Sequence, residues 1–142
     1  MSEQNKALIR RGVDQIWNKG HFAVADELVA DDFVVHATTL TGEIAGREGI
    51  TQYFGALRAA FPDLTFTIED HIAEGNRVVT RWTARGTHRG EFQGMPATGK
   101  SVCVSGIDVD RIADGKIAEC WMNLDELGLL HQLGAIPALQ PS

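Results

Sequence analysis

The spacing of hydrophobic residues changes at Pro62, and this change divides the chain into a helical part and a strand part. Before Pro62, apolar residues recur three or four positions apart over residues 50–61, which predicts an amphipathic helix. From Leu64 onward, apolar and polar residues alternate, which predicts a strand. Helices followed by a series of strands are typical of an α+β domain whose helices pack on one face of a sheet.

The other elements follow from the same two periods. Ile9, Val13, Ile16 and Trp17 recur at helical spacing and predict a first helix that ends at Gly20. The remaining predicted elements are a short helix at 23–30, strands at 33–37, 64–72, 77–88, 100–112 and 116–124, and a short closing helix. We expect the strands to form an antiparallel meander.

Composition excludes several classes of protein. The chain has 142 residues, of which 44% are hydrophobic and 23% charged, as expected for one soluble domain spanning 1–142. The net charge is −6 and no basic run is present, so neither nucleic acid nor a membrane is an expected partner. Neither a signal peptide nor a membrane-spanning segment is apparent, which predicts a cytoplasmic protein.

No cofactor or metal is indicated by the motifs. Cys103 and Cys120 lack the spacing of metal ligands and are expected to be small buried hydrophobic residues in a reducing compartment. The chain has no glycine-rich phosphate loop, no His-Glu-x-x-His motif and no nucleophile elbow. We therefore expect neither an organic cofactor nor a metal ion.

The segment 86–100 is a long, glycine-rich connection between two predicted strands. Long loops inside compact domains are usually either functional or disordered. This one carries His88, Phe92 and Met95, and Pro96 stiffens it, so it is not a flexible linker. It is either an ordered flap that closes over something apolar or a plain structural crossover.

The last hairpin predicts which residues face the interior. A two-residue turn at Asp114-Gly115 would set Asp110 opposite Glu119, which like charges disfavour. A three-residue loop that includes Ala113 instead sets Asp108 opposite Cys120. This register predicts an inner wall formed by Val104, Gly106, Asp108, Cys120 and Met122, and an outer apolar stripe formed by Ile107, Val109, Ile117 and Trp121. Such a stripe favours a homodimer.

Asp108 is the leading candidate for a catalytic group. A carboxyl group in an apolar cavity loses hydration, so its pKa rises and it can exchange a proton near neutral pH. The alternative is that Asp108 binds a buried backbone amide or pairs with an arginine. His36 and His88 are further candidates for ligand contact or for structural hydrogen bonding, whereas His21, His71 and His131 are expected to be solvated or structural.

Segments 106–112, 114–121 and 125–134 resemble the SnoaL-like polyketide cyclases, or predicted ester cyclases, of the NTF2-like superfamily. The resemblance extends from the first helix to Gly134. It implies a cone in which a strongly curved antiparallel sheet wraps over N-terminal helices around an apolar pocket. The superfamily includes cyclases, isomerases, hydrolases, hydroxylase-like proteins and binding proteins, so the fold does not determine the reaction.

The resemblance also bears on the site. It implies that His36 faces the pocket and that Asp108 occupies a polar active-site position. The cyclases carry a catalytic aspartate one residue after the position of Trp121, where this chain has Met122, which cannot carry a proton. Asp125 is expected to cap the last helix. The expected pocket lining is Trp17, Phe54, Trp82, Phe92, Met95, Val104, Cys120 and Met122, although the large aromatic residues among them could equally be core.

Three functions are compatible with these residues. The first is a cofactor-independent enzyme that transfers protons on an apolar, polyketide-like carbonyl compound, with Asp108 as the base and His36, His88 or Asn123 as donors to the enolate oxygen. The second is a non-catalytic protein that binds a small apolar organic molecule, which Met122 would suit. The third is a hydrolase or hydroxylase-type relative that activates water.

Overall fold

The computed structural model describes residues 2–37 and 42–136 of the chain. Its elements follow the predicted order of helices and then strands. They are α1 (Ser2–Gly12), a π-helix (Val13–Asn18), a 3₁₀ turn (Phe22–Val24), α2 (Ala25–Leu28), β1 (Val29–Ala37), β2 (Ile44–Ala45), α3 (Gly46–Ala60), β3 (Thr65–Glu74), β4 (Arg77–Thr87), β5 (Ser101–Ala113), β6 (Lys116–Leu124) and α4 (Glu126–Leu133). The predicted α+β class is confirmed.

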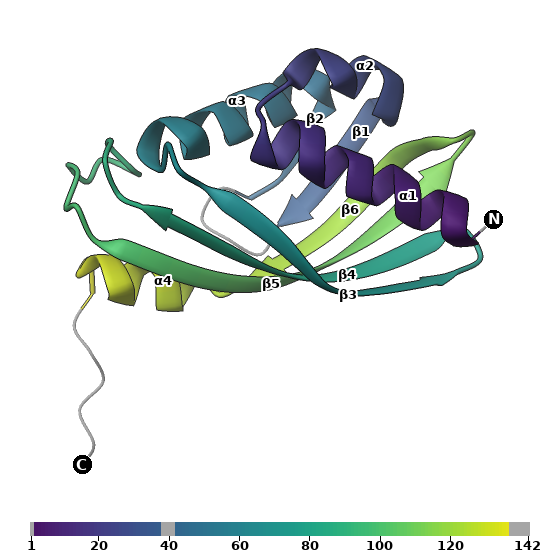
Figure 1. Cartoon of the computed structure of the whole chain (residues 1–142). Coiled ribbons are helices and arrows are strands. Elements are labelled where there is room, and N and C mark those ends of the chain that lie inside the picture. Colours follow the sequence, from purple (N-terminus) through teal and green to yellow (C-terminus); the bar gives the residue numbers. More distant parts are fainter. Residues whose placement is uncertain (1, 38–41, 137–142) are drawn as a thin grey trace.

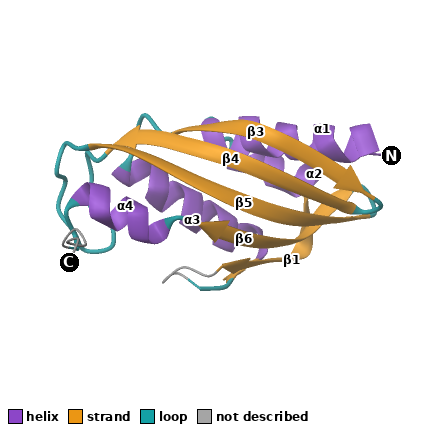
Figure 2. Cartoon of the chain, turned by 90° about the horizontal axis from the view of Figure 1, so that it is seen from below, coloured by secondary structure: helices purple, strands orange, loops and turns teal. Residues whose placement is uncertain are grey.

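The strands form one curved sheet in the order β2-β1-β6-β5-β4-β3. Helices α1, α2 and α3 lie together on one side of this sheet (Figure 1). Viewed from below, the strands cover these helices, and α4 lies at one end of the sheet (Figure 2). α4 packs against β5.

One strand pair differs from the expected antiparallel meander. β1 pairs with β6 in the parallel direction, with Val35 opposite Cys120 and His36 opposite Trp121. β1 does not pair with β3, the next long strand, because α3 carries the chain across the sheet before β3 begins (Figure 1). The sheet is therefore mixed, and β1 with the short β2 extends it beyond β6.

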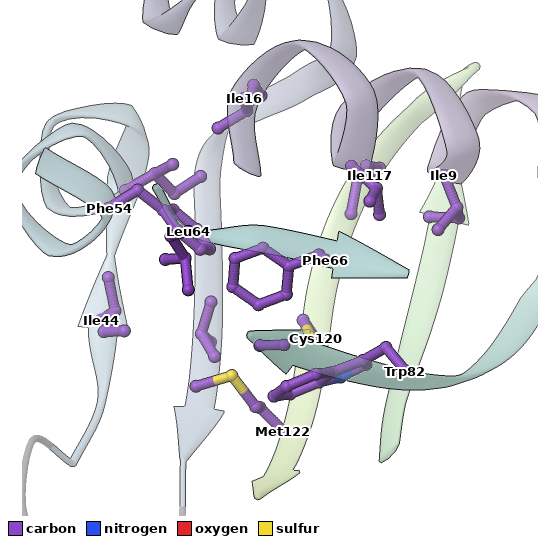
Figure 3. Packing of buried hydrophobic residues seen from close by; sticks show 14 of the residues in the cluster. Ile9, Ile16, Ile44, Phe54, Leu64, Phe66, Trp82, Ile117, Cys120 and Met122 are labelled. Carbon is purple, nitrogen blue, oxygen red and sulfur yellow. The ribbon is translucent and has the colours of Figure 1, made fainter. Parts of the chain in front are cut away.

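The inner face of the sheet and the facing helices share one hydrophobic core. Figure 3 shows Phe66, Trp82 and Met122 from the strands pointing into the same space as Phe54. Trp17 joins them, with ring centroids 4.9 Å from Phe66 and 6.1 Å from Trp82. Aromatic packing of this kind contributes beyond the area that it buries.

The turn of the β5–β6 hairpin corrects the predicted three-residue loop. The turn has two residues, Asp114 and Gly115, both with positive φ (52° and 73°). Such turns match the twist of the strands and favour Asp-Gly. A two-residue turn was expected to set Asp110 opposite Glu119. The structure avoids this contact because the register shifts between Ile117 and Glu119.

This shift sets Asp110 opposite Cys120, and Asp108 opposite Met122 rather than Cys120. It also places Glu119 directly opposite Arg111, whose Nε donates to Glu119 Oε1 at 3.1 Å.

The inner wall was predicted correctly, but the positions of several other strand residues were not. Ile117 was expected in the outer stripe, yet it is 8% exposed and faces inward because the bulge at Ala118 shifts its side chain. A second register shift, between Ile68 and Asp70 in β3, leaves Ile72 62% exposed and turns the imidazole nitrogens of His71 into the protein. Cys103 is exposed rather than buried, because Val102 and Val104 take the inward positions beside it.

Candidate functional site

Two adjoining cavities lie between the helices and the inner face of the sheet. Their volumes are about 60 and 80 Å³. Residues that line both are Trp17, Tyr53, Phe54 and Met122. The first lies towards α1, β1 and the β5–β6 hairpin; the second lies towards the segment 86–100 and α4. Their mostly apolar lining with a few polar groups matches the composition of a small-molecule site, whereas their volumes are below the roughly 300–1,000 Å³ of a typical one.

The residues predicted to line a pocket gather here, with one exception. The first cavity contacts Cys120, the second contacts Trp82, Phe92 and Val104, and the shared residues complete the set. Met95 contacts neither cavity among the described residues. It packs against the core and forms a bridge with Phe92 instead.

Asp108 and Asp110 are the carboxyl groups on the wall of the first cavity. Their residues are 1% and 7% exposed, respectively. Burial raises the pKa of Asp110 to about 7, while the Cys120 thiol, by donating to the carboxylate, lowers it. Burial, and then the charge of Asp110, raise the pKa of Asp108 well above its ordinary value. Ionisation of Asp110 opposes ionisation of Asp108, so the two buried carboxyl groups are protonated more readily than exposed ones.

Several polar atoms near this pair have no hydrogen-bond partner among the described residues. They are both carboxyl oxygens of Asp108, the hydroxyl of Thr80 and the indole nitrogen of Trp82. The indole N–H lowers the pKa of Asp108, the smallest of the three effects on that carboxyl, although its geometry falls short of a hydrogen bond. Buried polar groups are rarely left unpaired, so a cluster of them marks a place that accepts polar atoms from a ligand or water.

Trp82 reaches this position because residue 106 is glycine. A Cβ built on Gly106 would lie 2.2 Å from the indole ring, and Gly106 is directly opposite Trp82 in the sheet. Only a residue without a side chain leaves room for the ring at this point of β5. The sequence pattern thus places an indole N–H beside Asp108.

Tyr53 was not among the predicted site residues, although it lines both cavities from α3. Burial raises the pKa of its phenol, and the charges of Asp108 and Glu126 raise it further. The phenol is therefore neutral at physiological pH and can donate a hydrogen bond to a ligand. Its place three residues after Ile50, at the edge of the apolar stripe of α3, was the signal that could have revealed it.

Asp110 is the other site residue that the sequence analysis missed. It follows Asp108 by two positions, so simple alternation along β5 places it on the same face. That signal was present in the sequence.

His36 does not face the cavities, contrary to its predicted position. Its neighbour Val35 takes the inward place on β1, so His36 points to the outer face. There its Nε2 lies 2.6 Å from Glu119 and its ring stacks on Trp121 at 5.5 Å. The hydrogen bond to Glu119 is the largest cause of the raised pKa of His36. Glu43, which lies 3.3 Å from Nδ1, raises this pKa less.

His88 is buried, and among the described residues it lines neither cavity. Its Nδ1 accepts from the backbone N–H of Thr98 at 3.2 Å and lies 2.9 Å from the Thr98 hydroxyl. The ring is also 5.5 Å from that of Phe61. His88 therefore holds the two ends of the 86–100 segment together.

The segment 86–100 is an ordered flap. Arg89 and Gly90 donate backbone hydrogen bonds to Ala60 at the end of α3 (2.9 and 3.1 Å). A tight turn between Phe92 and Met95 brings Phe92 and Gln93 to the second cavity. The flap thus closes over an apolar space, as one of the two predicted alternatives requires.

The described residues contain neither a metal-type cluster of side chains nor a membrane-spanning helix. No group of three or more His, Cys, Asp or Glu side chains in ranges 2–37 and 42–136 is arranged to hold a metal ion. Within the same ranges, no helix is long and apolar enough to cross a membrane.

Comparison with known proteins gives consistent matches. The family model described as SnoaL-like polyketide cyclase matches residues 7–133. The nogalonic acid methyl ester cyclase of Streptomyces nogalater is 32% identical over 119 residues, covering 83% of this chain and 89% of the relative.

Solved structures agree with this match. A candidate SnoaL-like polyketide cyclase from Jannaschia sp. CCS1 superimposes with a TM-score of 0.86 at 26% identity, covering 96% of this chain and 95% of that chain. AclR, a candidate hydroxylase from Streptomyces galilaeus, superimposes with a TM-score of 0.85 at 29% identity, covering 96% of this chain and 100% of that chain. IdmH, a candidate polyketide cyclase from Streptomyces antibioticus, superimposes with a TM-score of 0.82 at 34% identity, covering 92% of this chain and 99% of that chain.

Proposed function

The chain belongs to the SnoaL-like polyketide cyclase family, and we propose that it is a cofactor-independent enzyme that transfers protons on an apolar, polyketide-like carbonyl compound. The observation that carries this proposal is the buried pair Asp108–Asp110 on the wall of an otherwise apolar cavity. A base is most effective when its pKa is near the working pH, and burial raises the pKa of Asp110 to about 7.

The pair supplies both groups that the reaction needs. Its ionised carboxylate takes a proton from the carbon next to a carbonyl, and the electrons of that C–H bond form an enolate. The carboxyl that keeps its proton donates to the developing oxygen, and the phenol of Tyr53 is placed to donate to it as well. For an aldol ring closure, the enolate carbon attacks a second carbonyl, and the alkoxide that forms recovers the proton.

This assignment extends the sequence-based hypothesis. Asp108 alone was expected to be the base, with His36, His88 or Asn123 as donors. His36 lies on the outer face and His88 holds the flap, so the proposal now uses Asp108, Asp110 and Tyr53, which all line the first cavity.

A second candidate is a protein that binds such a compound without converting it. Met122 favours this alternative, because it occupies the place of the family aspartate and lines both cavities. The similarity to AclR keeps a hydroxylase-type reaction as a third candidate. Under either alternative the wild-type protein has no cyclase turnover, so substitution of the carboxyl groups has no such rate to change.

Turnover of an aromatic polyketide ester, such as nogalonic acid methyl ester, tests the proposal. Asp108→Asn and Asp110→Asn keep the shape of the site but cannot accept the proton, so each should lower kcat by about 10²-fold or more with little change in affinity. Asp32→Asn, at an exposed position on β1, is the matched control and should leave kcat unchanged. Full turnover by both carboxyl variants would reject the proposal, and binding without any turnover by the wild type would favour the carrier.

We also propose that the protein forms a homodimer through the outer face of the sheet. Ile107 is 49% exposed there, and Val109 and Trp121 are half-buried beside it. Ile117 no longer belongs to this stripe. Sedimentation equilibrium should give twice the 15.5 kDa chain mass, and Ile107→Glu should return the monomer.

A further inference from the structure

A row of polar side chains crosses the sheet behind the proposed site. In register, His71 of β3 is opposite Thr80 of β4, Thr80 is opposite Asp108 of β5, and Asp108 is opposite Met122 of β6. Residues directly opposite one another share a face, and their Cβ atoms lie about 4.5–5.5 Å apart. His71, Thr80 and Asp108 therefore form one continuous polar row on the inner face.

Each member of this row has buried polar atoms that lack a partner among the described residues. They are both ring nitrogens of His71, the hydroxyl of Thr80 and both carboxyl oxygens of Asp108. Thr80 and Asp108 are each only 1% exposed. Three neighbouring unpaired groups in one row are unusual, because leaving a buried polar group without a partner is costly.

The row extends away from the cavities. Asp108 lines the first cavity, but Thr80 and His71 are not among the described residues that line either one. They lie on the side where α1 packs against β3. Neighbouring buried polar groups that make no direct hydrogen bond to one another are a setting in which buried water bridges side chains.

We propose that His71 and Thr80 are positioning residues for Asp108: bridged by buried water, they form a hydrogen-bonded row that supports the carboxyl group from the side opposite the ligand. Neither touches a bound compound. The Thr80 hydroxyl donates toward the carboxylate when Asp108 is ionised and accepts when it is protonated, since a hydroxyl can do both. The neutral imidazole of His71 can likewise donate with one nitrogen and accept with the other.

Other groups act on the two ends of the row. Asp110, Tyr53 and the Trp82 indole face Asp108 from β5, α3 and β4. The charges that act on His71 come from α1 and are Arg10, Lys6 and Glu3. Burial, followed by Arg10 and Lys6, lowers the pKa of His71, so the imidazole is neutral at physiological pH, as the row requires.

The test is an NMR titration of the Asp108 carboxyl carbon in the ligand-free protein, with the signal assigned by its loss in Asp108→Asn. Thr80→Val keeps the shape but removes the hydroxyl, and a lost hydrogen bond to a carboxylate should raise the Asp108 pKa by about one unit. His71→Phe should move it in the same direction. Thr80→Ser retains a hydroxyl and should restore the wild-type titration.

Thr83→Val is the matched control, because Thr83 lies on the same strand but on the outer face, opposite Ser105 and Thr67. It should leave the Asp108 titration unchanged. Unaltered titration in both Thr80→Val and His71→Phe would overturn the proposal, and so would a shift in Thr80→Val alone, since His71 would then not belong to the row. If Thr80→Val does not fold, Thr80→Ala replaces it.

The inference relies on the proposed function only for the importance of Asp108. The titration requires neither substrate nor turnover. An unchanged Asp108 titration in the variants would therefore reject the row while leaving the catalytic proposal in place. Full turnover by both Asp108→Asn and Asp110→Asn would reject the catalytic proposal while leaving the row in place.

Discussion

Asp108 and Asp110 lie two positions apart on β5, and both carboxyl groups are buried on the inner face of the sheet. Among the described residues, no arginine or lysine lowers the pKa of either carboxyl group. A fold that only needed stability would not keep two such groups, because ionising either one in an apolar environment costs free energy. The pair is therefore the strongest indication that this cavity carries out chemistry or recognises a polar atom.

The pair should make the protein less stable at alkaline pH. Asp110 ionises near its ordinary pKa when unfolded but at about 7 when folded, so the folded state holds the extra proton. The stability that this proton contributes is fully present below the pKa of Asp110 in the unfolded chain and is lost as pH rises through about 7. Asp108 acts in the same direction. Urea denaturation should give a lower free energy of unfolding at pH 8 than at pH 5.

Asp110→Asn identifies the source of this dependence. At about 1.4 kcal/mol per pKa unit, the variant should gain on the order of a few kcal/mol over the wild type at pH 8 and little at pH 4. Asp32→Asn, on an exposed position, should follow the wild type at every pH. If the Asp110 variant keeps the full decline between pH 5 and 8, this carboxyl is not the group responsible.

The absence of a side chain at Gly106 should be essential for the position of Trp82. Gly106→Ala places a methyl group 2.2 Å from the indole ring, so the ring must move, at a cost of about 1–3 kcal/mol for overpacking a core. Denaturation with tryptophan fluorescence should show the loss of stability and an altered emission spectrum.

A second glycine provides the control for this substitution. A Cβ on Gly55, within α3, would meet nothing within 4 Å. Gly55→Ala should therefore stabilise the protein by about 0.5–1 kcal/mol through its better helix propensity. Equal effects of the two substitutions would show that contact with Trp82 is not what matters at position 106.

The alternation of apolar and polar residues was sufficient to predict the inner wall formed by β4, β5 and β6. It was not sufficient for register, because a β-bulge depends on tertiary packing that a single sequence does not reveal. The bulge at Ala118 placed Ile117 inside, and the shift before Asp70 exposed Ile72 and buried the nitrogens of His71. The parallel β1–β6 pair was also beyond local pattern, since it joins residues far apart in the chain.

Protonation of His36 should be linked to Glu119 across the outer face. The hydrogen bond to Glu119 is the largest cause of the raised pKa of His36, so Glu119→Gln should lower that pKa measurably in an NMR titration. Glu43→Gln should lower it less, because Glu43 is the weaker partner. A larger effect from Glu43→Gln would mean that the 2.6 Å contact with Glu119 is not the dominant one in solution.

Met122 lies directly opposite Asp108, at the position where the resemblance to the cyclases implies an aspartate. Met122→Asp adds a third carboxyl beside two that are already hard to ionise. Like charges opposite one another in a sheet are destabilising, so the variant should fold at pH 5 and lose stability on going to pH 8 more steeply than the wild type. Met122→Leu keeps an apolar side chain of similar volume and should change stability by less than about 1.5 kcal/mol at either pH. Parallel denaturation curves for Met122→Asp and the wild type across this pH range would mean that the new carboxylate points away from the pair.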